Sequence, residues 1–209
     1  MSTTQAEQEV SNNHPRASRT PSGNALLFAR NFFRHPRMLG SIVPSSRFLI
    51  KQLLQPIDWN EARVIVEYGP GVGCITAEIL RRMRSDAILI AIEVNPDFVA
   101  YLRSAFTDER LHVVEASAES VDEILERHGR GKANYIVSGI PFSTIPAEVR
   151  ERIIRKTAES LAPAGAFLVF QFSTRVLEDL QRIFRYVRRQ FEPLNVLPAH
   201  LFFCQLGAT

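Results

Sequence analysis

Residues 64–73, with the sequence VIVEYGPGVG, constrain the fold of this chain more than any other segment. The apolar run Val64–Val66 predicts a buried strand, and Glu67 stands at its carboxyl end. Three glycines alternate through the turn that follows: Gly69, Gly71 and Gly73. Because glycine has no Cβ, such a turn lets the backbone pass close to a ligand. A helix predicted from about residue 74 to 84 completes a strand–turn–helix unit, which places that ligand at the carboxyl ends of a parallel sheet. The dinucleotide fingerprint G-x-G-x-x-G fails here, since Cys74 stands at its third glycine.

The spacing E-x-G-x-G-x-G resembles motif I of the class I S-adenosylmethionine-dependent methyltransferases. The resemblance implies S-adenosylmethionine as cofactor and S-adenosylhomocysteine as product. It also implies that Glu67 takes the methionine ammonium group, while the three glycines let the backbone approach the methionine and ribose portions. The alternative role for Glu67 is that of a structural cap at the end of its strand.

A second apolar run, Ala87–Ile92, predicts a strand that is buried on both faces. It ends in Glu93, roughly 20 residues beyond the glycines, where an acidic side chain can accept hydrogen bonds from both ribose hydroxyl groups. Val94 follows as a further cofactor contact. By the same resemblance, Ser117 and Ala118 border the adenine ring.

Strands and helices alternate along the rest of the chain, which predicts an α/β fold with a mostly parallel sheet. The further predicted helices are 96–106, 117–128, 146–161 and 174–189. The further predicted strands are 111–114, 135–137 and 166–170, with extended stretches around 194–196 and 201–203. This ending resembles the antiparallel hairpin that closes the methyltransferase sheet, so we expect a Rossmann-like sheet of seven strands with helices on both faces.

Length and composition predict a single domain. The chain has 209 residues, of which 45% are hydrophobic, enough for one core but not for a second full domain. It has neither a membrane-spanning apolar stretch nor an apolar signal segment. We expect a disordered polar tail at 1–23, amphipathic and lid helices at 24–59, and the methyltransferase domain at 60–209.

Cys74 and Cys204 are expected to be buried thiols in a reducing compartment. No cluster of His and Cys residues has the spacing of metal ligands, so we expect a cytoplasmic enzyme that needs no metal.

Positive charge concentrates before the predicted domain. Residues 1–60 contain seven basic and three acidic side chains, whereas the remainder has a slight acidic excess. Within 24–35, apolar residues at helical spacing define one side: Ala25, Phe28, Ala29, Phe32 and Phe33. Arg30, Arg34 and Arg37 lie on another side, and Pro36 should end the helix. A basic amphipathic helix of this kind suits an anionic bilayer surface. The alternative is a helix whose phenylalanines pack on the sheet edge.

The segment 39–49, with the sequence LGSIVPSSRFL, resembles the glycine–Pro-Ser-Ser-Arg signature of bacterial phospholipid N-methyltransferases. Ser-Gly-Ile-Pro-Phe at 138–142 is similar to their motif IV. Members of this family methylate phosphatidylethanolamine, and related enzymes methylate ornithine lipids. The resemblance implies that Ile42 and its neighbours cover the cofactor, that Ser138 and Gly139 lie close to the methyl group, and that the enzyme is peripheral on the inner face of the cell membrane.

The expected chemistry is transfer of an activated methyl group to an amine, which needs positioning more than strong acid or base catalysis. Desolvation lowers the pKa of a protonated amine, so a general base is optional. Three aromatic residues are candidates for contact with the methylated cation: Tyr68, Phe142 and Phe172. Core packing is the alternative for Tyr68. His200 is a candidate proton acceptor, or else a structural histidine of the hairpin. Arg37, Arg47 and Lys51 are candidates for the lipid phosphate, or else a solvated helix face.

Three other functions stay open from the sequence. An rRNA adenine dimethyltransferase carries an Asn in motif IV for the adenine amino group, but here that position is Gly139. The adenine-contacting Asp of those enzymes is matched by Ser117, and the predicted core lacks the basic excess expected for nucleic-acid binding. A methyltransferase for a soluble amine or natural product is the second alternative. A degenerate, non-catalytic binding protein is the third.

Overall fold

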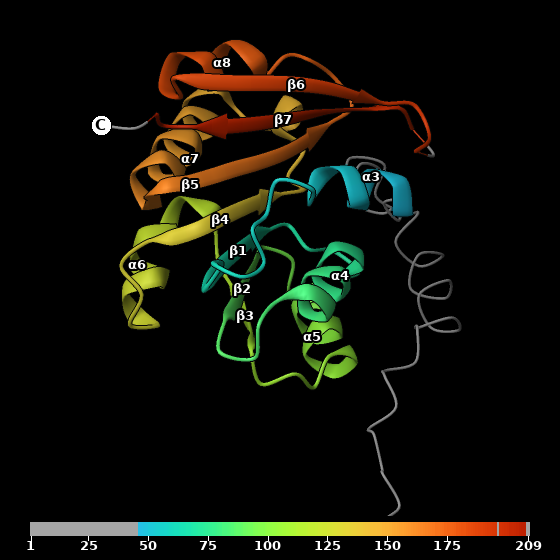
Figure 1. Cartoon of the computed structure of the whole chain (residues 1–209), viewed down its shortest axis with the longest axis vertical. Helices are drawn as coiled ribbons and strands as arrows, with labels where there is room; N and C mark the ends of the chain where they lie inside the picture. Colours follow the sequence, from blue (N-terminus) through green and yellow to red (C-terminus); the bar gives the residue numbers. More distant parts are fainter. Residues whose placement is uncertain (1–45, 196, 208–209) are drawn as a thin grey trace, which may run out of the picture.

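The computed structural model describes residues 46–195 and 197–207, which form one seven-stranded sheet with helices on both faces (Figure 1). The strand order is β3-β2-β1-β4-β5-β7-β6. The strands are β1 (Val64–Tyr68), β2 (Ile88–Glu93), β3 (Leu111–Glu115), β4 (Ala133–Ser138), β5 (Leu161–Gln171), β6 (Tyr186–Glu192) and β7 (Ala199–Gln205). The first five pair in parallel, while β7 runs antiparallel to both β5 and β6. This arrangement confirms the predicted α/β sheet and its closing hairpin.

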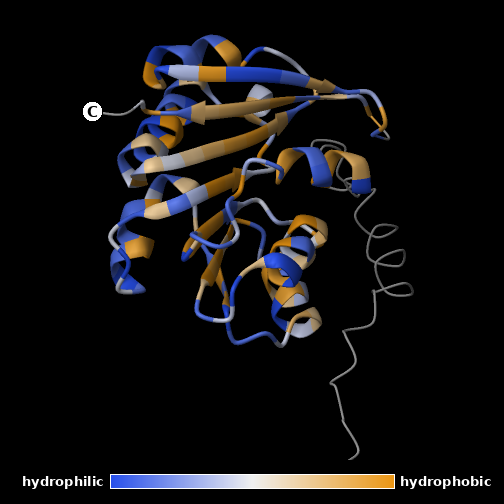
Figure 2. Ribbon diagram, in the orientation of Figure 1, coloured by the Kyte–Doolittle hydropathy of each residue, from blue (hydrophilic) through white to orange (hydrophobic). Residues whose placement is uncertain are grey.

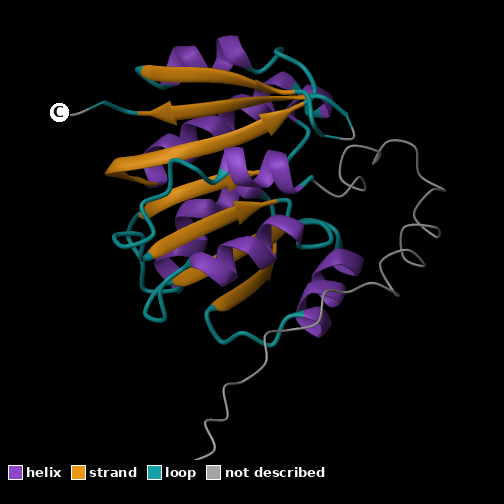
Figure 3. Cartoon of the chain, turned by 45° about the vertical axis from the view of Figure 1, so that its right-hand side comes forward, coloured by secondary structure: helices purple, strands orange, loops and turns teal. Residues whose placement is uncertain are grey.

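The sheet separates the apolar core into two layers, each covered by its own set of helices. The helices are α3 (Arg47–Leu53), α4 (Cys74–Arg82), α5 (Pro96–Ala105), α6 (Val121–Arg127), α7 (Ala147–Ser160) and α8 (Leu177–Ile183), with 3₁₀ turns η2 (Ala118–Ser120) and η3 (Phe142–Thr144). One core cluster joins α6, α7 and α8 to the sheet, and the other joins α3 and α4 to its opposite face (Figure 3). Figure 2 shows the central strands as mainly hydrophobic, as strands covered on both faces must be.

The central strands bring the functional segments to one edge. In β1, all five residues are buried, and Tyr68 stands opposite Ile92 of β2 and Ser138 of β4. Parallel strands in register end together. The glycine turn after β1, Glu93 at the end of β2 and the motif IV segment after β4 therefore converge at the carboxyl edge of the sheet.

The helix predicted at 174–189 is wrong in its second half. The structure ends α8 at Ile183 and begins β6 at Tyr186, and the connecting turn to β7 includes Pro193 and Pro198. β6 pairs with β7 over its whole length, from Tyr186 opposite Gln205 to Glu192 opposite Ala199. The ladder of hydrogen bonds to β7 outweighs the helix propensity of this arginine-rich stretch, because strand formation depends on a partner far along the chain.

Several sequence predictions fall outside the described residues. The polar tail at 1–23, the amphipathic helix at 24–35 and Ile42 are among them. The basic residues of that segment lie outside as well: Arg30, Arg34 and Arg37. Within residues 46–195 and 197–207, no helix is long and apolar enough to cross a bilayer.

Candidate active site

A cavity of about 300 Å³ opens at the carboxyl ends of β1, β2 and β4. It collects six of the residues predicted as cofactor or methyl contacts: Gly69, Glu93, Val94, Ser117, Ala118 and Gly139. The sequence did not single out its apolar wall, which comes from α5, α7 and the loops: Ile92, Phe98, Ala116, Ile140, Pro141, Ile145, Val149 and Ile153. Val149 and Ile153 lie four residues apart on α7, so helical periodicity could have shown that they share a face.

Hydrogen bonds of Glu93 link the end of β2 to the glycine turn after β1. Its Oε1 accepts hydrogen bonds from the backbone N–H groups of Val94 and Asn95, at 2.9 and 3.0 Å. Its Oε2 accepts a longer bond of 3.2 Å from the N–H of Gly71, in the glycine turn. A carboxylate offers about four lone-pair positions. Glu93 is therefore oriented by the backbone and still has acceptor capacity on Oε2 for a hydroxyl group in the cavity.

The three glycines of the turn after β1 adopt the left-handed conformation that favours glycine. Gly69, Gly71 and Gly73 have φ angles of 65°, 55° and 78°. A Cβ on Gly73 would lie 2.6 Å from the ring of Phe106, at the end of α5. Close packing of α4 against α5 thus accounts for the third glycine, which does not line the cavity.

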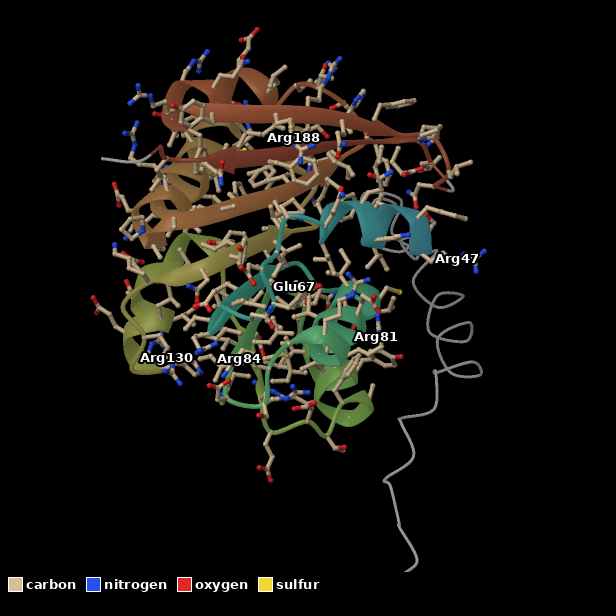
Figure 4. The ribbon with its side chains drawn as sticks, in the orientation of Figure 1. Arg47, Glu67, Arg81, Arg84, Arg130 and Arg188 are labelled. Carbon is tan, nitrogen blue, oxygen red and sulfur yellow. The ribbon has the colours of Figure 1, made fainter. Side chains whose placement is uncertain are left out.

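Glu67 is buried between β1 and α4, with 1% of its surface exposed (Figure 4). Its Oε2 accepts a hydrogen bond of 2.6 Å from the hydroxyl of Thr76. The pKa of Glu67 is raised to about 7, chiefly by burial; the hydrogen bond from Thr76 opposes the rise, and the negative charge of Glu93 adds to it. A buried carboxyl group of this kind is suited to a cationic ligand, because a positive charge would restore its ionised form. The role of Thr76 was not predicted, because no local pattern marks it.

Gln171, at the end of β5, shapes the motif IV loop. Its Nε2 donates to the carbonyl of Ile140 at 2.7 Å, and its Oε1 accepts from the N–H of Phe142 at 3.0 Å. Ser138 is fully buried, and its hydroxyl accepts a bond from the N–H of Ile140 at 3.3 Å. Gln171 was not predicted as a site residue, although a polar residue at the end of an otherwise apolar strand is a usable signal.

Gly139 lies against the glycine turn. A Cβ at this position would meet the carbonyl oxygen of Gly69 at 3.1 Å and the ring of Phe170 at 3.3 Å. Both distances are shorter than ordinary van der Waals contact. The site therefore has no free room here for the asparagine side chain that the rRNA enzymes carry.

The structure corrects the predicted cation contacts of two aromatic residues. Tyr68 and Phe142 are fully buried in the core, and both rings pack on Phe167, at 6.2 and 6.4 Å. The Tyr68 hydroxyl is paired with that of Thr157 at 3.1 Å, and burial raises its pKa. Neither ring presents a face to the cavity, because β1 and η3 turn them toward α7. Phe172 is exposed instead, beside Phe170.

His200 lies on β7 opposite Gln171 and does not line the cavity. Its ring stands 5.1 Å from that of Phe191, and burial lowers its pKa, with Arg189 adding to the effect. His200 is therefore a structural residue of the hairpin, and it does not contact the cavity. Arg47 and Lys51 are exposed on α3. Across the described part of the chain, no group of three His, Cys, Asp or Glu side chains is arranged to hold a metal ion.

The strand order, the glycine turn after β1 and the acidic residue ending β2 define a class I S-adenosylmethionine-dependent methyltransferase. The residues present fit the cofactor, because Glu93 keeps an acceptor position, Glu67 is a buried carboxyl group, and the contact between Gly69 and Gly139 leaves no Cβ in the cavity. When bound, S-adenosylmethionine supplies an activated methyl group. The chain belongs to the family described as "Methyltransferase small domain", which matches residues 39–193.

Two kinds of curated relative were found. An ornithine lipid N-methyltransferase of Singulisphaera acidiphila is 35% identical over 182 residues, which is 86% of this chain and 95% of that protein. A ribosomal RNA small subunit methyltransferase A of Acidithiobacillus ferrooxidans is 30% identical over 116 residues. That match covers 56% of this chain and 38% of the rRNA enzyme, so it concerns a part of each.

Solved structures agree on the fold. A precorrin-6y C5,15-methyltransferase of Geobacter metallireducens has a TM-score of 0.61 at 16% identity, over 76% of this chain and 88% of its own. The SAH-bound methyltransferase PaMTH1 of Podospora anserina has a TM-score of 0.56 at 15% identity, over 88% and 89% of the two chains.

Proposed function

We propose that this enzyme transfers methyl groups from S-adenosylmethionine to the amine headgroup of a membrane lipid. The observation that carries the proposal is the 35% identity to an ornithine lipid N-methyltransferase over nearly the full length of both proteins. The substrate would be ornithine lipid, or phosphatidylethanolamine and its methylated forms.

The roles of the site residues are part of the same proposal, and the lining of the cavity supports those of Glu93, Ser117 and Ala118. Glu93 binds the ribose hydroxyl groups, Glu67 holds the methionine ammonium group, and Ser117 and Ala118 lie against the adenine. The apolar wall of the cavity favours the neutral form of an incoming amine, since desolvation lowers the pKa of a cationic amine. The proton can then be lost to solvent before attack. With Tyr68, Phe142 and His200 outside the cavity, the protein contributes mainly binding and alignment.

Attachment to the membrane is the second part of the proposal. Arg47 and Lys51 are exposed on α3. The sequence adds Arg30, Arg34 and Arg37 in the segment before it. We propose that these cations bind lipid phosphates and hold the enzyme as a peripheral protein on the cytoplasmic side of the cell membrane. Neither Cys74 nor Cys204 forms a disulfide, which is compatible with that reducing compartment.

The rRNA alternative is favoured by partial sequence matches, but Gly139 argues against it. It offers no side chain to an adenine amino group, and the packing around it leaves little room for one. A soluble amine remains the other alternative.

The test uses the purified full-length protein with methyl-labelled S-adenosylmethionine and three acceptors. These are vesicles that contain phosphatidylethanolamine or ornithine lipid, a short-chain monomeric amine, and ribosomal RNA. We expect mass spectrometry to find added methyl groups on the lipid alone. Equal rates on the monomeric amine would favour a soluble substrate, and methylated adenine would favour the rRNA function.

A further inference from the structure

Five large exposed apolar side chains belong to segments that meet at the carboxyl edge of the sheet: the ends of β5 and β6, the β6–β7 turn and the start of α3. We call this group the hairpin patch: Phe48, Phe172, Phe191, Leu194 and Leu197. Of the large hydrophobic side chains exposed in the described residues, only two lie elsewhere. These are Val94, in the cavity wall, and Tyr186, at the opposite end of β6. Apolar exposure that concentrates in one place marks an interaction site rather than chance.

Hydrogen bonds hold the patch in a defined shape. Asn195, buried in the turn, accepts a bond from the N–H of Ser46 at 2.8 Å and donates to the carbonyl of Leu197 at 2.9 Å. The first bond joins the turn to the N-terminus of α3, two residues before Phe48. Glu192, also buried, accepts a bond of 2.7 Å from the N–H of Leu194. Leu194 and Leu197 thus project from backbone that these hydrogen bonds hold on both sides of Asn195.

The patch borders the active-site loop. Phe191 stands opposite His200, and His200 stands opposite Gln171, so the three residues form one row across β6, β7 and β5. Adjacent strands lie about 4.8 Å apart, which puts Phe191 about 10 Å from Gln171. Gln171 bonds Ile140 in the cavity wall, and Phe172 is the next residue along the chain.

The charged side chains exposed on α3, β6 and β7 have one sign. Four basic side chains are exposed on α3 and β6: Arg47, Lys51, Arg188 and Arg189. Figure 4 shows Arg47 projecting from α3 away from the body of the protein. Across residues 46–53 and 186–205 the only acidic residue is Glu192, and it is buried with a bond to the backbone. Apolar side chains beside basic ones fit an anionic bilayer, whose acyl boundary takes the first and whose headgroups attract the second.

We propose that the hairpin patch inserts into the interface of an anionic bilayer and holds the cavity mouth at the level of the lipid headgroups. The inference rests on the proposed lipid substrate, and it adds membrane contact by the β6–β7 turn, which is distant in sequence from the basic N-terminal segment and α3. The turn between β6 and β7 acts as the anchor, and α3 supplies Phe48 and the cations beside it.

The first experiment measures binding of the full chain to vesicles of equal parts phosphatidylglycerol and phosphatidylcholine, which contain no primary amine. The variant Phe191→Ser/Leu194→Ser changes two exposed side chains, so it should fold. We expect its partitioning to fall about tenfold or more, with S-adenosylmethionine affinity unchanged. The matched control is Tyr186→Ser, on the same strand and similarly exposed (54% against 57% for Phe191), which should bind as the parent does.

A second measurement places the turn in the bilayer. Tryptophan fluorescence of Leu194→Trp should shift to the blue on vesicle binding and be quenched by brominated lipids, whereas that of Tyr186→Trp should not. Equal vesicle binding by the parent and the double variant, no vesicle binding by the parent, or an unquenched Leu194→Trp would overturn the proposal. So would a parent dimer that the double variant abolishes without loss of vesicle binding, because the patch would then join two copies of the chain.

Failure of the lipid function is a separate outcome. It would appear as a parent enzyme that methylates no lipid amine in vesicles, whatever its partitioning. If the parent methylates vesicle lipid and the double variant does so at the same rate, the lipid function stands and the hairpin patch is not its anchor.

Discussion

The side-chain amide of Gln171 donates a hydrogen bond of 2.7 Å to the carbonyl of Ile140 and so ties the end of β5 to the wall of the cavity. The same side chain accepts from the N–H of Phe142 and is 4% exposed. A buried backbone group that loses such a partner pays its full cost of desolvation. The conformation of the motif IV loop therefore depends on a residue that lies about 30 positions later in the chain.

Replacing Gln171 with Leu should distort this loop and weaken cofactor binding. We expect a loss of about 1–3 kcal/mol in the free energy of unfolding, and a fall in S-adenosylmethionine affinity measured by calorimetry. The control is Thr157→Val, which removes the bond to Tyr68 in the core, away from the cavity. It should destabilise the protein while leaving the affinity at the parent value. A Gln171→Leu variant with parental affinity would contradict the role given to Gln171.

Gly139→Ala should impair cofactor binding because its methyl group would press on the Gly69 carbonyl and on Phe170. Overpacking of this kind typically costs about 1–3 kcal/mol. Gly131→Ala is the matched control, since a Cβ there meets no atom within 4 Å. Thermal unfolding and cofactor titration of both variants check the prediction. If both variants unfold at the same temperature and bind the cofactor equally well, the Gly69–Gly139 contact can adjust without loss of stability or affinity.

Glu67→Gln should stabilise the cofactor-free protein in a pH-dependent way. The carboxyl pKa is about 7 in the folded state against 4.5 ordinarily, so ionisation is penalised only in the folded protein. Between these values the unfolded chain gives up its proton while the folded one keeps it, and stability falls as pH rises. The advantage of the glutamine variant should therefore widen by roughly 2–3 kcal/mol from pH 5 to pH 8, by denaturant unfolding. A constant difference across this range would mean that Glu67 has an ordinary pKa.

Glu93→Gln should weaken S-adenosylmethionine binding by about tenfold or more. Only one of the two oxygens remains in the amide, so the variant loses either the bonds that Val94 and Asn95 donate to Oε1 or the bond that Gly71 donates to Oε2, and the NH₂ cannot accept in their place. Glu115→Gln is a close control, because Glu115 stands opposite Glu93 at the end of β3 but is exposed and outside the cavity. Equilibrium dialysis with the cofactor compares the two variants. If the two variants bind the cofactor with similar affinity, Glu93 does not bind the ribose.

Replacing Arg30, Arg34 and Arg37 together with Gln should weaken binding to anionic vesicles at low salt. The electrostatic contribution is ~1 kcal/mol for each basic residue near the surface and is screened as salt rises. Flotation at low and high salt measures it. We expect residual binding that resists salt, carried by apolar side chains. If the triple variant binds as well as the parent at low salt, these arginines do not meet the membrane.

The sequence alone was sufficient for the class of fold and for one side of the site. The patterns behind these predictions are local, so they can be recognised without knowledge of tertiary contacts. The apolar runs of β1 and β2, the three glycines at positive φ and the acidic Glu93 each follow from constraints within a few residues. Five of the residues named for the cofactor, together with Gly139, accordingly line the cavity.

Only the tertiary structure decided where the aromatic side chains point and where β6 begins. Tyr68 and Phe142 adjoin motifs at the site, but their rings turn toward α7 and Phe167, an orientation set by packing between distant elements. Likewise, Tyr186–Glu192 is extended because β7 offers a partner for its backbone, which local propensity cannot reveal. The bond from Gln171 to Ile140 and the bond from Ser46 to Asn195, which joins the start of α3 to the β6–β7 turn, depend on the same kind of long-range contact. Contacts between segments far apart in sequence exist only once the sheet has formed.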